Sequence, residues 1–150
     1  METSFLADLH PKVVHFPVAL LVTYSFLEIF GIIFNKEFIT KSALLILCIG
    51  VISAFVAVLS GNSAASEFNL WSDESKALLD QHQNFATYLL WFAIIGCALR
   101  IYLTIKKKFI GFGKYIFILF AVVLILLVYK TSLHGGELVK KYGVGTDFIN

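Results

Sequence analysis

Four apolar segments, each about as long as the hydrocarbon core of a membrane is thick, constrain the fold more than any other feature of this sequence. They lie at residues 13–34, 42–60, 82–103 and 115–133, and polar or charged residues bound each of them. A helix rises about 1.5 Å per residue, so roughly 20 residues cross a hydrocarbon core of about 30 Å. The pattern predicts an all-α polytopic membrane protein, in which residues 1–150 form one domain of four transmembrane helices.

The composition excludes most alternatives to a membrane fold. Of the 150 residues, 59% are apolar and 15% are charged, whereas soluble domains average about 45–50% and about 25%. The two cysteines are too few for a disulfide-stapled secreted module, and the apolar content excludes intrinsic disorder. The 12 basic residues are scattered and the net charge is +2, so no continuous basic face for a nucleic acid is expected. The expected partner is the lipid bilayer.

The connections between the segments predict two antiparallel hairpins with both termini on one side. Residues 35–37 join the first two segments, and residues 104–114 join the last two. The longer connection, residues 61–81, is an expected outer loop. Ser72 is a suitable N-cap near its end, so the third helix is expected to begin near Asp73 and to protrude outward.

The end of the fourth segment carries a pair of glycines directly after His134. Gly135 and Gly136 are expected to end the fourth helix, because glycine permits a sharp turn of the backbone. A C-terminal tail at residues 134–150 is then expected to cover the outer ends of the neighbouring helices.

The basic residues that flank the segments predict the orientation of the chain. The two hairpin connections and their flanks hold seven basic residues, Lys36, Lys41, Arg100, Lys106, Lys107, Lys108 and Lys114, against one acid, Glu37. The opposite side holds Lys12, Lys76, Lys130, Lys140 and Lys141 against Glu2, Asp8, Glu67, Asp73, Glu74, Asp80, Glu137 and Asp147. Because Lys and Arg are retained on the cytoplasmic side, the hairpin connections are expected inside a bacterial inner membrane and both termini outside, periplasmic or extracellular. No basic leader precedes the first segment, so it is expected to be retained.

Four histidines lie at the predicted outer ends of three helices. They are His10, His15, His82 and His134. A b-type haem needs an imidazole on each side of its ring, so we expect His15 to pair with His82 or His134, with His10 beside them. Gly61 and Gly135, together with Ala57 and Ala86, offer room for a flat ligand. His10 and His15 are five residues apart, about 140° around an ideal helix, but Pro11 and Pro17 predict an irregular start.

Two alternatives remain open for these histidines. All four imidazoles, His10, His15, His82 and His134, are candidate ligands of zinc or copper. They could instead cap helix ends, with no cofactor at all. No Cys-x-x-Cys-His motif is present, so covalent attachment of a c-type haem is excluded. Hydrolase motifs are also missing, so the chain is expected to be no enzyme by itself, but at most a redox subunit.

Charged and thiol side chains also lie inside the predicted spans. Glu28 lies in the inner half of the first span, and Arg100 reaches a similar depth from the third. The two are expected to form an intramembrane ion pair, because an unpaired charge is costly there. A role of Glu28 in proton or ion movement is the alternative. Cys48 and Cys97 lie near this depth and are interpreted as small buried apolar residues rather than a redox pair.

Motifs at both ends of the chain resemble one family of bacterial membrane proteins. The opening motif reads Leu9-His10-Pro11-Lys12-Val13-Val14-His15-Phe16-Pro17, and the closing motif reads Leu133-His134-Gly135-Gly136-Glu137-Leu138-Val139. With Ser60-Gly61-Asn62-Ser63 after the second segment, they resemble the family catalogued as domain of unknown function 2231. In that family the last motif commonly continues with tyrosine, where this chain has Lys140. The resemblance implies a four-span domain without an assigned activity.

These observations lead to three hypotheses about function. The first is a small electron-transfer protein that holds one haem b near the outer face and passes electrons from membrane quinol to an outer-face acceptor. The second is a transport or assembly component whose histidines bind zinc or copper or only cap helices. The third is a proton-coupled carrier built around Glu28, for which four spans would require a homo-oligomer.

Overall fold

The computed structural model describes residues 5–67 and 72–144, and this part of the chain is all-α, with no strand. Its helices are α1 (Phe5–Val13), α2 (His15–Ile33), α3 (Glu37–Glu67), α4 (Asp73–Ile105) and α5 (Ile116–Tyr142), with a short 3-10 helix, η1 (Gly111–Tyr115), before α5. Four stretches are long and apolar enough to cross a membrane: Phe5–Ile33, Glu37–Ser66, Asp73–Ile105 and Gly111–Tyr142. The prediction of an all-α protein with four membrane-spanning helices is confirmed.

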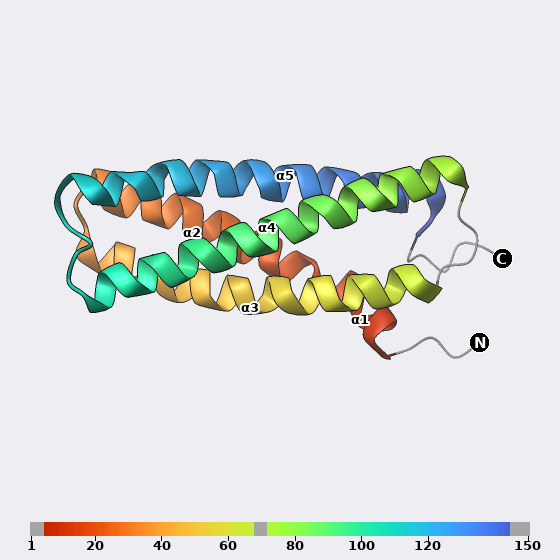
Figure 1. Ribbon diagram of the computed structural model, residues 1–150, viewed down its shortest axis with the longest axis horizontal. Coiled ribbons are helices and arrows are strands. Elements are labelled where there is room, and N and C mark those ends of the chain that lie inside the picture. Colours follow the sequence, from red (N-terminus) through yellow and green to blue (C-terminus); the bar gives the residue numbers. More distant parts are fainter. Residues whose placement is uncertain (1–4, 68–71, 145–150) are drawn as a thin grey trace.

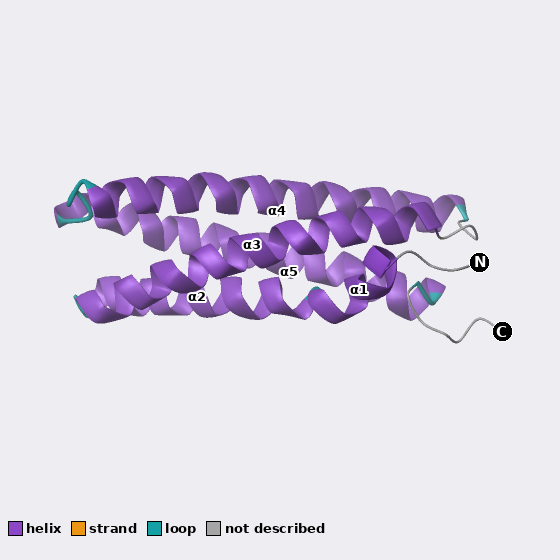
Figure 2. Cartoon of the chain, turned by 90° about the horizontal axis from the view of Figure 1, so that it is seen from below, coloured by secondary structure: helices purple, strands orange, loops and turns teal. Residues whose placement is uncertain are grey.

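The long helices run up and down along one elongated bundle (Figure 1). Helix α2 packs against α3 and α5, α4 packs against α3 and α5, and α1 lies against α3. The α2–α3 and α4–α5 connections lie at one end of the bundle, and α1 and the last turns of α5 lie at the other (Figures 1 and 2). We refer to these as the connection end and the histidine end.

Small residues at the helix contacts allow the backbones to approach closely. A Cβ atom added at Gly96 of α4 would overlap the ring of Phe120 on α5, and one at Gly50 of α3 would lie 2.8 Å from Leu21 of α2. Close approach of this kind drives helix association in lipid, where the hydrophobic effect offers little. Large apolar side chains point outward instead, among them Ile52, which is 66% exposed. Such a surface suits contact with lipid tails.

Helix α5 continues past the glycine pair, so the prediction that Gly135 and Gly136 end it is wrong. The helix runs to Tyr142, and Gly143, with a φ of 65°, caps it in the left-handed conformation. The Gly143 N–H bonds the Val139 carbonyl at 3.0 Å. Glycine inside a helix costs only about 1 kcal/mol relative to alanine, which packing of the helix can offset. Residues 145–150 of the expected tail lie outside the described residues.

The expected outer loop is also mostly helical. Helix α3 extends through Glu67, and α4 begins at Asp73, as the sequence predicts. The Ser72 Oγ accepts a hydrogen bond from the Ser75 N–H at 3.2 Å, which confirms Ser72 as the N-cap. Of the predicted loop at residues 61–81, only residues 68–71 lie outside the described part of the chain.

The first span begins irregularly, as its two prolines predict. Helix α1 ends at Val13 and α2 begins at His15, so the two are separated by Val14 alone. Pro17 has no N–H to donate to the Val13 carbonyl, and its ring crowds that carbonyl, which accounts for an interruption at this point. The interruption lets α1 take its own direction against α3 (Figure 1).

Candidate histidine site

His10 extends from α1 toward the last turns of α3. Its Nδ1 atom lies 3.1 Å from the Ala57 carbonyl oxygen and 3.1 Å from the Ser60 Oγ. A carbonyl can only accept a hydrogen bond, so the bond to Ala57 requires a proton on Nδ1 and leaves the Nε2 lone pair unused. A Cβ atom at Gly61 would lie 2.8 Å from Cε1 of this ring. Gly61 therefore provides the space in which the imidazole lies.

His82 is held in the same way between α4 and α5. Its Nδ1 lies 3.0 Å from the Thr131 carbonyl oxygen, and a Cβ atom at Gly135 would lie 3.0 Å from Cε1 of the ring. Thr131 and Gly135 are one helical turn apart, so one face of α5 supplies both the acceptor and the space. The Nε2 atom of His82 again keeps its lone pair.

His134 is the third histidine at this end. Its Nδ1 is buried and has no hydrogen-bond partner among the described residues, and its ring lies against Phe85 at a centroid distance of 5.2 Å. His10 and His82 are close enough to interact electrostatically, as are His82 and His134. His10, His82 and His134, from α1, α4 and α5, form what we call the histidine cluster.

His15, the expected first ligand, does not reach this cluster. Its side chain is exposed and lines a shallow hollow of about 280 Å³ with Phe16, Ala19 and Leu20 of its own helix. The structure thus brings His10, expected only beside the ligands, into the position expected for His15. The reason is geometric, because residues five apart diverge by about 140° and the interruption at Val14 does not remove that divergence.

The imidazoles of the histidine cluster are the side chains that could hold a haem or a metal ion at this end of the bundle. Metal-binding histidines almost always donate their second ring N–H to a carbonyl or carboxylate, as His10 and His82 do here. Zinc sites need three or four protein ligands, and the described residues hold no group of three His, Cys, Asp or Glu side chains arranged around an ion. A haem iron needs only one or two imidazoles, because the porphyrin supplies the other ligands.

A family model described as "Predicted membrane protein (DUF2231)" matches residues 7–148, from α1 to beyond the end of α5. The chain belongs to this family. The resemblance drawn from the terminal motifs is thereby confirmed, and the four apolar helices agree with the family description. No curated protein and no solved structure matches the chain.

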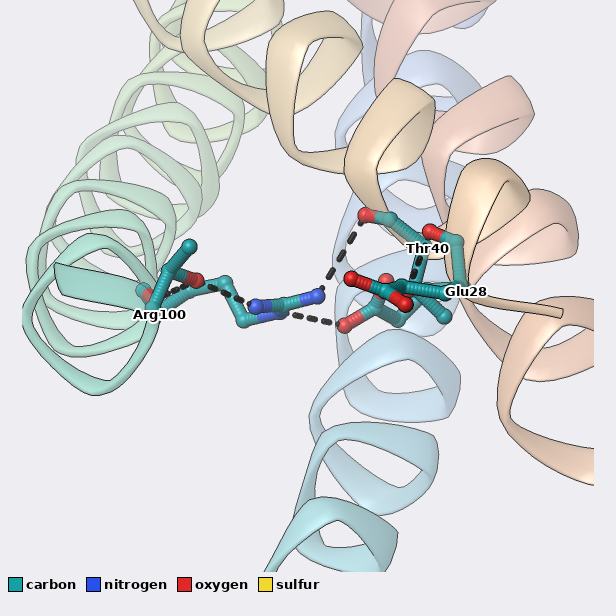
Figure 3. A network of polar contacts seen from close by, with 5 residues as sticks. Glu28, Thr40 and Arg100 are labelled. Carbon is teal, nitrogen blue, oxygen red and sulfur yellow. Dashed lines mark hydrogen bonds and ion pairs between the residues drawn. The ribbon is translucent and has the colours of Figure 1, made fainter. Parts of the chain in front are cut away.

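The DUF2231 chain also holds the expected ion pair, far from the histidine cluster. Arg100 Nε donates to Glu28 Oε1 at 2.7 Å, and the two side chains are 2% and 0% exposed. The remaining bonds of the guanidinium run to the Thr104 hydroxyl at 2.6 Å and to the Thr40 carbonyl at 3.3 Å (Figure 3). The Phe109 ring covers it, with its centroid 3.2 Å from Cζ. The pair ties α2, α3 and α4 together.

Several of these partners were missed in the sequence. Thr104 follows Arg100 by four residues, the spacing of neighbours on one helix face, and this signal was readable. Thr131 precedes Gly135 by the same spacing. The Ala57 and Thr40 carbonyls carry no sequence signal, because every residue has one.

The two cysteines of the DUF2231 chain lie in the core as free thiols. Their Sγ atoms are 3.7 Å apart, with Cys97 buried and Cys48 half-buried, between α3 and α4. Their burial agrees with the interpretation of both as small apolar residues of the helix contact.

Proposed function

We propose that this DUF2231 protein binds one haem b through His10 and His82 and serves in electron transfer at the histidine end. The observation that carries the proposal is the shared anchoring of the two rings, in which Nδ1 bonds a carbonyl of another helix and Nε2 is left to bind iron. The cofactor would supply one-electron redox chemistry. We propose that this end lies at the outer side of the inner membrane. There the protein would take electrons from quinol and pass them to an outer-face acceptor.

The surrounding residues would fix the ligands and exclude water. The carbonyls of Ala57 and Thr131 orient the two imidazoles, and Gly61 and Gly135 give the rings room beside the helix backbones. His134 and Phe85 lie beside His82 and would form part of the wall of the pocket. The polarity of such a wall is one of the factors that set the reduction potential of a haem.

The absorption spectrum of the purified protein tests this proposal. Protein from haem-sufficient cells, kept in mild detergent, is expected to show a Soret band that moves on reduction with dithionite. His10→Ala and His82→Ala are each expected to lose most of the bound haem, whereas the matched variant His15→Ala, at an exposed position, retains it. A colourless wild-type preparation, or loss of haem in His15→Ala alone, would contradict the proposal.

A metal ion is the second candidate ligand, because the Nδ1 of His134 is buried and has no hydrogen-bond partner among the described residues. Since these residues form no group of three protein donors, water would have to supply the remaining ligands. Zinc or copper would then be found in the washed, haem-free protein at one ion per chain. His134→Ala is expected to release this ion, while His15→Ala keeps it. Absence of stoichiometric metal from the wild-type protein would exclude this second candidate.

A further inference from the structure

A basic cavity lies at the connection end of the bundle. Its volume is about 660 Å³, within the range of about 300–1,000 Å³ that small-molecule sites occupy. The α2–α3 connection and the segment between α4 and η1 supply much of its lining. The charged residues that line it are five bases and one acid: Lys36, Lys41, Lys107, Lys114, Arg100 and Glu37.

Three of these bases have no carboxylate partner among the described residues. Lys41 is neutralised by Glu37, with 2.7 Å between Nζ and Oε1, and Arg100 is neutralised by Glu28. Lys36 and Lys107 make no ion pair in this part of the chain, and Lys114 donates only to the uncharged Asn35 Oδ1, at 2.7 Å. The cavity therefore carries about three uncompensated positive charges.

Arg100 adds a buried donor to these lysines. The guanidinium lines the cavity and is only 2% exposed. Of its five N–H groups, three donate to Glu28, Thr104 and Thr40, and the other two make no hydrogen bond among the described residues. A guanidinium together with lysine ammonium groups is the usual chemistry of phosphate recognition.

We propose that this cavity binds a phosphate-bearing anion, either the head group of an anionic phospholipid or free phosphate. The cavity lies at the end of the membrane-spanning helices, where head groups are found, and Phe109 and Ile110 add apolar surface beside its charges. Basic pockets between membrane helices on the cytoplasmic side bind such head groups. The site is independent of the histidine cluster, which lies at the opposite end of the bundle.

Thermal unfolding of the full-length protein in neutral detergent tests the proposal. Phosphatidylglycerol, uncharged phosphatidylcholine or inorganic phosphate is titrated at constant ionic strength. The triple variant Lys36→Gln, Lys107→Gln, Lys114→Gln removes the unpaired charges. Its matched control is Lys76→Gln, Lys130→Gln, Lys140→Gln, which removes the same charge from exposed positions outside the cavity. Circular dichroism verifies that both variants keep their helices.

The expected result is a saturable rise in the unfolding temperature with phosphatidylglycerol but not with phosphatidylcholine. Each lysine near an anionic head group contributes roughly fivefold in affinity, so the cavity variant should bind at least tenfold more weakly, on the order of a hundredfold at most. The control variant should bind like the wild type. Saturation by inorganic phosphate, without a response to phosphatidylglycerol, would support the site with free phosphate as its source. Saturation by neither anion, or equal binding by both variants, would overturn the proposal.

Discussion

Whether an imidazole fits at the histidine end depends on the absence of a Cβ atom at the glycine beside it. A second glycine, which has no neighbouring side chain among the described residues, provides a matched control. A Cβ atom at Gly61 would lie 2.8 Å from the His10 ring, while one at Gly136 would meet no atom within 4 Å. Both glycines lie inside helices, so alanine should improve the helix propensity of both by about 0.5–1 kcal/mol.

We therefore predict opposite outcomes for Gly61→Ala and Gly136→Ala. The change at residue 136 should raise the free energy of unfolding by about 0.5–1 kcal/mol. The change at residue 61 should not, because the His10 ring must move away from its bonds to Ala57 and Ser60. Denaturant unfolding in detergent measures both values. Equal stabilisation by the two substitutions would show that His10 is not held against Gly61.

The buried ion pair at the other end gives a second prediction at this scale. Glu28→Leu leaves the Arg100 charge unpaired at a position 2% exposed, which should lower the free energy of unfolding by about 3–5 kcal/mol. The double variant Glu28→Leu, Arg100→Met removes both charges and should recover most of this loss, because apolar pairs replace buried ion pairs well. Unfolding of the single and double variants in detergent checks this. A double variant as unstable as the single one would contradict it.

At the scale of the helices, the N-cap of α4 is the feature most open to test. The Ser72 hydroxyl accepts the Ser75 N–H at 3.2 Å. Ser72→Ala should therefore lower the free energy of unfolding by about 1 kcal/mol. Ser66→Ala is the control, because that hydroxyl is exposed and, among the described residues, bonds only the Ser63 carbonyl of its own helix. A loss no larger than that of the control would indicate that the cap does not stabilise the folded state.

The sequence predicted the helices and the start of α4 well, but it predicted the C-terminal ends of α3 and α5 poorly, for physical reasons. Apolar runs report burial in lipid, and so they located the four spans but not the polar turns that extend α3 to Glu67 and α5 to Tyr142. Gly135 suggested a helix end, yet it lies inside α5. Its lack of a side chain leaves room for the His82 ring to pack against the helix. The choice between His10 and His15 depended on the direction of α1 before the interruption at Val14, which its packing against α3 determines.

At the scale of the whole molecule, chemical labelling of the two ends of the bundle tests the predicted orientation. Single cysteines placed at Lys36, between α2 and α3, or Lys107, between α4 and η1, report the connection end, and those at Lys76, near the start of α4, or Lys140, near the end of α5, report the histidine end. In a background without Cys48 and Cys97, a membrane-impermeant maleimide added to spheroplasts should label only the second pair, because basic connections are retained inside. Labelling of the first pair alone would reverse the topology and place the histidine cluster in the cytoplasm.

The anchoring of the imidazoles makes the histidine end a sensor of correct assembly. His10 belongs to α1, but a carbonyl of α3 orients its ring. His82 belongs to α4, but a carbonyl of α5 orients its ring. No single helix, and neither half of the chain taken alone, contains both anchored rings. A chain that inserts into the bilayer but does not pack its four helices together would therefore bind no haem and show no haem absorption, if the proposed function holds. The absorption would then report the packing of the helices and not their insertion.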